Sequence, residues 1–344
     1  MLSILAARTD FSVGESIITT EMLIDEAKKV GASAVAITDT MSITSMVDFT
    51  TRAKQNNLKP IIGVRLRISE DPTWRQGKGE KKKNMPPEHF LTAYVLTDEG
   101  LKAIFRLLSI GNSAARFYYT AKISYQDLYD ELAKLPVGAL AVHLSDIHGV
   151  VTRADALDHA NKLADLLGPN YVFAPLIPVN TPYFGAVNAC SLRILATTEL
   201  RPLVVRPAFY EPEGADAHEI MGAIANGNKL TDGWHRSMHN RDMHIMGTRD
   251  LAAECSKAAK HLALRGMAGT GPIWMKGLAN TDALADMVQY VWEKQAVSLP
   301  VMAQDEFAEL VAQCKAGWAA RFGSETFGHQ PSKEDLIEVY KPRL

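Results

Sequence analysis

The alternation of apolar and polar positions is clearest between Ser33 and Ile68. Ala34–Thr38 is a short apolar run of the kind that forms a strand buried on both faces. Ser45–Asn56 then places apolar residues at helical spacing, and proline ends that helix at Lys59-Pro60 because it cannot continue it. Pro60–Ile68 is a second apolar strand. A strand, a helix and a strand in this order predict a right-handed βαβ unit with a parallel sheet.

The same alternation continues along the first part of the chain. Further strands are predicted at Ser3–Ala7, Phe90–Leu96, Ala139–Leu144, Tyr171–Ile177 and Leu203–Arg206, and helices at Glu21–Val30, Glu99–Ile110, Tyr125–Leu135, Ala154–Leu167 and Ala186–Thr197. This pattern indicates an α/β fold with either a barrel or an open parallel sheet. This strand-bearing part ends near residue 212. Ligands in such folds sit beyond the carboxyl ends of strands, so chemistry is expected near Thr38-Asp39-Thr40.

Beyond Pro212 the pattern becomes helical. Helices are predicted at Ala217–Asn226, Thr248–Arg265, Thr281–Lys294 and Ala303–Phe322. Gly266–Gly277 is predicted to be a glycine-rich turn, and it lacks the spacing of a nucleotide-binding loop. The sequence therefore predicts two parts, an α/β part at 1–212 and a helical extension at 213–344.

Composition narrows the possible partners and compartment. The 344 residues carry a net charge of −2, so the surface as a whole is not a nucleic-acid footprint and DNA binding should be weak or absent. The cysteines, Cys190, Cys255 and Cys314, are too far apart for a disulfide framework or a metal knuckle and suit a reducing cytoplasm. No apolar run approaches the ~20 residues of a membrane span, and the start lacks a signal-peptide pattern. We expect a cytoplasmic protein with no membrane contact.

Two polar segments have alternative interpretations. Pro72–Pro87 is rich in glycine, proline and lysine, which favours a solvated surface loop, although Lys81–Lys83 could touch phosphate. His235, His239 and His244 lie four and five residues apart in WHRSMHNRDMH, which resembles metal-ligand spacing. Arginines interleave them and no Cys or Glu completes a set, so a polar loop is favoured over a metal site.

Five segments together resemble a known family. TDFS, AVAITDT, LKPIIGVRLRI, HFLTAYVLTDEGLKAIFRLLS and DAHEIMGAIANGNKLTD follow the order and spacing of the N-terminal PHP (polymerase and histidinol phosphatase) domain of the DNA polymerase III alpha subunit of bacteria or phages, a C-family replicative DNA polymerase. FAELVAQCKAGWAARFG resembles the helix that leads into the palm of those enzymes. The resemblance covers Ser3 to Leu344 and is weaker between Cys255 and Lys276, which looks like an insertion.

The resemblance implies a distorted parallel β/α barrel of PHP type, similar to a TIM barrel, over residues 1–212. In active members the mouth of this barrel holds metals such as Mg, Mn or Zn for phosphoester hydrolysis. Most of the matching positions here cannot ligate a metal. They are Ala6, Arg8, Glu15, Asp39, Thr40, Arg65, His89, Pro207 and Phe209. His89 and, loosely, Glu15 keep ligand chemistry, and Asp39 matches a position that need not ligate. We therefore expect a degenerate site with no catalytic residue, and no metal cofactor unless the site proves active.

The arginines carry a separate hypothesis. Arg8 and Arg65 stand where the family has a histidine and a carboxylate, and Arg206 lies near a third such position. A guanidinium cannot coordinate a cation, so arginine–carboxylate pairs with Glu15 and Asp39 are expected to replace metal–ligand bonds. The alternatives are arginines that extend to solvent and a residual pocket for an anion such as phosphate. His89 taken alone is typical of a hydrogen-bonded structural histidine.

Three functions remain open at this stage. The first is a non-catalytic scaffold in DNA replication that docks a proofreading exonuclease subunit or another replisome protein. The second is a metal-dependent phosphoesterase or 3′–5′ exonuclease. The third is a stand-alone, virus-encoded mimic that captures a replication partner. The resemblance also places the palm aspartates of nucleotidyl transfer beyond Leu344. We therefore expect a piece of a longer polymerase or one product of a split gene, with no polymerase activity alone. In the split-gene case a separate polymerase chain is an expected partner.

Overall fold

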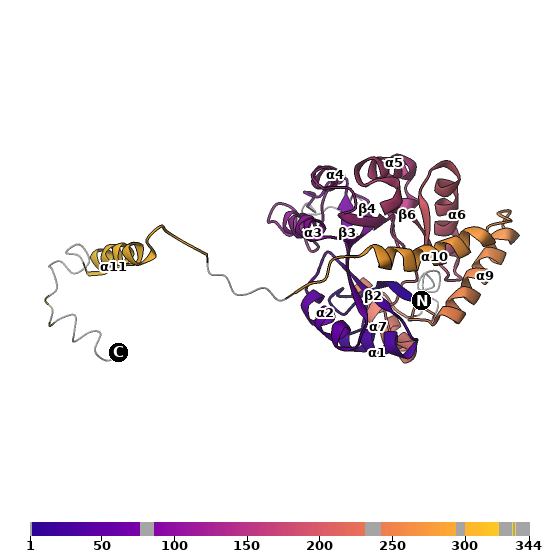
Figure 1. The fold of residues 1–344 in the computed structure, drawn as a ribbon, viewed down its shortest axis with the longest axis horizontal. Helices are drawn as coiled ribbons and strands as arrows, with labels where there is room; N and C mark the ends of the chain where they lie inside the picture. Colours follow the sequence, from indigo (N-terminus) through magenta and orange to yellow (C-terminus); the bar gives the residue numbers. More distant parts are fainter. Residues whose placement is uncertain are drawn as a thin grey trace. The chain divides into compact units, whose positions relative to one another are not determined.

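In the part of the chain that the structure describes, seven strands form one curled sheet in sequence order (Figure 1). The computed structural model describes residues 2–75, 86–230, 242–293 and 300–322, with Ser332 and Glu334. The strands are β1 (Ser3–Ala7), β2 (Ala34–Thr40), β3 (Lys59–Ser69), β4 (Glu88–Val95), β5 (Leu140–His143), β6 (Val172–Leu176) and β7 (Arg201–Val204). The helices between them are α1 (Thr20–Lys29), α2 (Met46–Gln55), α3 (Asp98–Gly111), α4 (Tyr125–Leu132), α5 (Ala156–Leu167) and α6 (Pro182–Thr197).

The predicted βαβ unit is confirmed. Strands β2 and β3 pair in parallel from Ala34 opposite Lys59 to Thr40 opposite Arg65, and α2 packs against both strands. The first six residues of β2 are buried, as expected for a strand with core on one face and helices on the other. The apolar run of the sequence is therefore explained by burial on two sides.

The predicted distorted β/α barrel is confirmed, and the distortion lies in β4. Strand β4 runs antiparallel to both β3 and β5, whereas the β1–β2, β5–β6 and β6–β7 pairs are parallel. No named helix lies between β3 and β4 in the described residues. The antiparallel strand β4 therefore breaks the parallel order of the sheet at this point.

The sheet curls until its first strand meets the segment after its last. Ala7 and Ala208 form a parallel bridge, in which Arg8 N donates to Ala208 O at 3.1 Å and Ala208 N donates to Ala6 O at 3.1 Å. The carboxyl ends of β1 and β2 and the later half of β3 thereby face one opening, which we call the barrel mouth. Residues that are distant in sequence are brought together there.

The helices between residues 212 and 292 belong to the same compact unit as the barrel, which runs from Met1 to Trp292. These helices are α7 (Ala215–Asn226), α9 (Thr248–Leu264) and α10 (Gly271–Met287). Helix α10 lies against β7 and β1, where Asn280 Nδ2 donates to Pro202 O at 2.7 Å and Thr281 Oγ1 donates to Val204 O at 2.8 Å. Residue 212 marks the end of the strand-bearing part, and the fold continues through the next eighty residues or so in the same core.

The prediction of a glycine-rich turn over Gly266–Gly277 is wrong in its second half. Helix α10 begins at Gly271, ten residues before the predicted start, with proline in its first turn. A Cβ at Gly277 would stand 3.1 Å from Val204 Cγ2 and 3.4 Å from Leu176 Cδ1. The glycine therefore serves close helix–strand packing rather than a turn.

The second unit, Glu293–Leu344, contains helix α11 (Glu306–Phe322). It agrees with the helix predicted at Ala303–Phe322. Phe307 and Trp318 are exposed on this helix, with relative exposures of 76% and 55%. Among the described residues, no helix combines the length and apolar character that crossing a membrane requires.

Candidate functional site

Two buried arginines and a buried aspartate form the centre of the barrel mouth. Arg8 Nη2 donates to both carboxylate oxygens of Asp146, at 2.7 and 2.8 Å. Arg65 Nε lies 3.7 Å from Asp146 Oδ1, and Arg65 Nη2 donates to Ile147 O at 2.5 Å. All three charged side chains are at most 3% exposed. Such charges remain stable in a protein interior only when they are paired and hydrogen-bonded.

Glu15 supplies a second carboxylate at the rim of the mouth. Its Oε2 lies 3.7 Å from Arg8 Nε and 3.5 Å from Arg65 Nη1, and it accepts a hydrogen bond from Thr40 Oγ1 at 2.9 Å. The Glu15 side chain is 26% exposed, so it is the member of the cluster that meets solvent. The two guanidinium charges are thus matched by two carboxylates.

Aromatic rings pack against both guanidinium groups. Arg65 Cζ lies 3.4 Å from the centroid of the Phe90 ring, and Arg8 Cζ lies 4.9 Å from that of Phe209. Phe209 also stacks on His218 at 5.4 Å. These side chains, with His148, line a cavity of about 200 Å³ at the mouth. The cavity wall is therefore built from aromatic faces and from an ion-paired cluster.

The cluster shifts the pKa of its own members. Burial alone would raise the pKa of Asp146, but Arg8 and Arg65 outweigh it and hold that pKa well below its usual range. Burial, together with the charge of Arg8, lowers the pKa of Arg65 to about 9, against the opposing effect of the two carboxylates. At neutral pH both residues are therefore charged, and the ion pairs are formed.

Asp39 accepts hydrogen bonds from uncharged groups and does not form the predicted ion pair with an arginine. It accepts hydrogen bonds from Thr9 N at 2.7 Å, Thr9 Oγ1 at 2.7 Å, Ser12 Oγ at 2.8 Å and Ser45 Oγ at 2.6 Å. Its carboxylate is completely buried, and no arginine lies within ion-pair distance of it among the described residues. Asp39 fixes the loop after β1 to the start of α2, and Asp146 takes the place that the sequence interpretation gave to Asp39.

His89 does not face the mouth. It precedes Phe90 in β4, and neighbouring strand residues point to opposite sides of a sheet. Phe90 lines the cavity, whereas His89 Nδ1 lies 3.1 Å from Arg153 Nη1, whose Nη2 pairs with Glu70 at 3.0 Å. The structural interpretation of this histidine therefore fits its surroundings.

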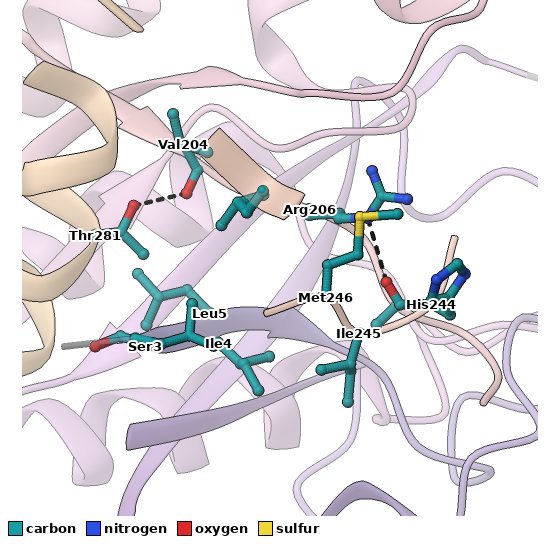
Figure 2. A pocket seen from close by; sticks show the side chains of 12 residues that line it. Ser3, Ile4, Leu5, Val204, Arg206, His244, Ile245, Met246 and Thr281 are labelled. Atoms are coloured by element: carbon teal, nitrogen blue, oxygen red, sulfur yellow. Dashed lines mark hydrogen bonds between the residues drawn. The ribbon is translucent and has the colours of Figure 1, made fainter. Parts of the chain in front are cut away.

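Arg206 donates to backbone oxygens instead of joining the ion-paired cluster, and Figure 2 shows it beside Met246 and His244. Its Nη1 donates to Pro178 O at 2.8 Å and its Nε to His244 O at 3.2 Å, and it lines a separate cavity of about 30 Å³. Of the three histidines in WHRSMHNRDMH, His244 lines that same small cavity. The other two, His235 and His239, fall outside the described residues, as does the lysine triplet Lys81–Lys83.

The remaining predicted positions either carry apolar side chains or contact the ion-paired cluster through another residue. Ala6 is a buried residue of β1, and Pro207 and Phe209 flank the bridging Ala208. Thr40 reaches the cluster only through its hydrogen bond to Glu15.

Sequence reasoning missed two buried residues beneath the mouth. Asp146 follows the apolar run Ala139–Leu144, and His143 is the last residue of β5. The His143 ring lies 5.8 Å from that of Tyr94, and its Nδ1 accepts from Ser145 N at 3.1 Å. Burial lowers the pKa of His143 to about 4, and Arg8 and Arg65 add to that effect. The position of Asp146 after a predicted strand was the signal that could have found it.

The described residues of the barrel mouth do not fit a catalytic metal centre. Such a centre needs about three or four protein ligands per ion, usually imidazole, thiolate or carboxylate. In the parts of the chain that the structure describes, no three His, Cys, Asp or Glu side chains converge to hold one. A cation placed between Glu15 and Asp146 would instead meet the guanidinium groups of Arg8 and Arg65.

Comparison with known proteins agrees with this architecture. Residues 5–174 match the PHP domain family. The chain is 27% identical over 352 residues to the DNA polymerase III subunit alpha of Yersinia pestis, an alignment that covers 99% of this chain and 29% of that protein. It is 24% identical over 226 residues to the corresponding subunit of Aquifex aeolicus strain VF5, covering 63% of this chain and 19% of that one. The chain thus spans less than a third of the length of these relatives.

Among solved structures, an amidohydrolase from Chromobacterium violaceum with bound sulfate and no metal is similar at a TM-score of 0.39 and 8% identity. The similarity covers 60% of this chain and 87% of that one.

Proposed function

The chain carries a PHP domain of the DNA polymerase III alpha subunit type, and from this premise we propose that it serves DNA replication as a non-catalytic scaffold. The single observation that supports this proposal is the ion-paired barrel mouth. Arg8 and Arg65 fill the positions where active relatives in the resemblance would hold metal ligands, and Asp146 and Glu15 neutralise them. A domain that has exchanged metal coordination for internal ion pairs keeps its shape without a metal and offers its surface to partners.

The first test is phosphoesterase activity. We expect no release of p-nitrophenol from bis(p-nitrophenyl) phosphate above background in the presence of Mg²⁺, Mn²⁺ or Zn²⁺, because the mouth lacks the ligands to hold a metal-bound hydroxide. Metal-dependent release that disappears in both Glu15→Gln and Asp146→Asn would overturn the proposal. Retention of release in both variants would point to a contaminating enzyme.

The second test concerns the partner. We propose that the domain docks a proofreading exonuclease subunit, and that a separate polymerase chain completes the assembly. The chain is mixed in solution with the purified exonuclease subunit of its own replication system, and size-exclusion chromatography reports whether the two co-elute. Co-elution supports the docking role, and failure to co-elute at concentrations well above ~1 μM would oppose it.

A further inference from the structure

An aromatic cluster lies on the surface between two loops that the proposed function does not use. The first loop follows β3 and carries Trp74, and the second joins α3 to α4 and carries Phe117, Tyr118 and Tyr119. Trp74 meets Tyr118 edge-on at 6.3 Å, and Tyr118 meets Tyr119 at 4.6 Å. The relative exposure of Tyr119 is 82% and that of Phe117 is 48%. Two large rings are therefore presented to solvent over a supporting aromatic layer.

Arg75 fixes this cluster in place. Its Nη2 donates to Ala115 O at 2.9 Å and to Phe117 O at 3.1 Å, and its Nη1 donates to Trp74 O at 3.0 Å. The same guanidinium lies 5.1 Å from the centroid of the Tyr118 ring. No carboxylate of the described residues lies within 4 Å of it, so among these residues the guanidinium leaves a positive charge beside the exposed rings. Its hydrogen bonds link the two loops, in addition to the contact between Trp74 and Tyr118.

The backbone at Tyr119 is strained in a way that displays its ring. Tyr118 and Thr120 form an antiparallel bridge around it, and Tyr119 has a φ of 57°, in the left-handed region. Glycine or asparagine adopts this conformation readily, whereas a tyrosine is costly there. Strain of this kind is concentrated at functional sites, because it persists only where the surrounding structure imposes it. An exposed, strained aromatic residue at the tip of a tight turn therefore points to a ligand.

We propose that Phe117 and Tyr119 form a base-stacking platform for single-stranded nucleic acid, with Arg75 providing the positive charge beside it. Exposed ring faces stack on bases of any sequence, and a nearby cation favours the phosphate backbone. Bases in a duplex are already stacked on each other and are not available to such rings. The platform consequently prefers single strands, and its affinity is modest because a single arginine contributes little counterion release.

The probe is a fluorescein-labelled oligo(dT) of about 20 nucleotides, followed by anisotropy with the full chain at about 50 mM salt. We expect the parent to bind it in the micromolar range, with weaker binding to a duplex of the same length. The double variant Phe117→Ala/Tyr119→Gly should weaken binding by about tenfold or more, since it removes two stacking partners. Tyr119→Trp should restore most of the affinity lost in Tyr119→Gly.

Matched controls separate stacking from loss of structure. Phe105→Ala removes a ring of 44% exposure from α3, outside the cluster, and should leave binding unchanged. Tyr119→Gly alone should melt at or above the temperature of the parent, because glycine relieves the strain at φ 57°. Equal binding of the parent and the double variant, or equal competition by an abasic oligonucleotide, would overturn the proposal. So would a double variant that keeps oligo(dT) binding and loses binding to an extended proline-rich peptide, since the rings would then serve a protein partner.

Discussion

Replacing Asp146 by alanine is expected to lower the free energy of unfolding by about 3–5 kcal/mol. The carboxylate is 1% exposed and receives two hydrogen bonds from Arg8 while lying 3.7 Å from Arg65. Its removal leaves two buried guanidinium groups with one partly exposed partner, Glu15. The cost arises chiefly from the uncompensated charges, and urea denaturation of parent and variant measures it.

Two further variants test this explanation of the Asp146→Ala effect. Glu15→Ala removes the carboxylate that is 26% exposed and lies at 3.5 to 3.7 Å, so it should cost about 1 kcal/mol. The triple variant Arg8→Met/Arg65→Met/Asp146→Leu removes all three buried charges and should recover most of the stability lost in Asp146→Ala. If Asp146→Ala and Glu15→Ala cost the same, or if the triple variant is the least stable, the ion-pair account of the mouth is wrong.

If ion pairs hold the barrel mouth together, divalent metal should have no effect on the stability of the protein. The ion-paired mouth offers a cation two positive neighbours, so Mg²⁺, Mn²⁺ or Zn²⁺ should not raise the melting temperature of the parent. Binding to the native state alone would raise it by mass action, and a clear rise would therefore reveal a metal site in the folded protein.

The βαβ unit could be predicted because its strands are buried on both faces. The run Ala34–Thr38 has no polar interruption, so its sequence pattern and its final environment coincide. The direction of β4 could not be predicted from its own residues. Direction depends on what connects β4 to β3, and the segment between them was interpreted only as a surface loop. An apolar run is enough to predict a strand, whereas the direction of that strand in the sheet depends on the segments that connect it to its neighbours.

The structure brings Arg8 and Arg65 together at the mouth, with a main partner that the sequence did not indicate. The two arginines were identified through the resemblance to the PHP family, whereas Asp146 lies in the loop after β5, far away in sequence. Asp39 has the same chemistry and also follows a buried strand, but four backbone and hydroxyl donors surround it. The sequence shows only that a carboxylate follows a strand. The fold determines whether arginines or hydroxyl groups surround that carboxylate.

The stability of the protein is also expected to fall as the pH is lowered from about 6.5 to about 4, by about 3 kcal/mol from His143 alone. Burial, supported by Arg8 and Arg65 and opposed by Asp146, lowers the pKa of His143 to about 4, whereas an unfolded histidine titrates near 6.5. Between these values the unfolded chain binds a proton that the native state does not bind. The contribution is therefore fully present above pH 6.5, is lost progressively toward pH 4 and is constant below it.

His143→Asn isolates this effect. The asparagine Oδ1 can replace Nδ1 as the acceptor for Ser145 N, and the group no longer titrates. His143 Nε2 is buried without a hydrogen-bond partner in the described residues, so the substitution removes no hydrogen bond that these residues make to that nitrogen. Urea denaturation across this pH range should show a slope that is clearly shallower for the variant than for the parent. His89→Asn, which replaces a histidine that is only partly buried, should change the slope much less. Parallel pH profiles for the parent and His143→Asn would show that His143 is protonated in the native state, and the electrostatic account of the mouth would then need a second negative charge beside that ring.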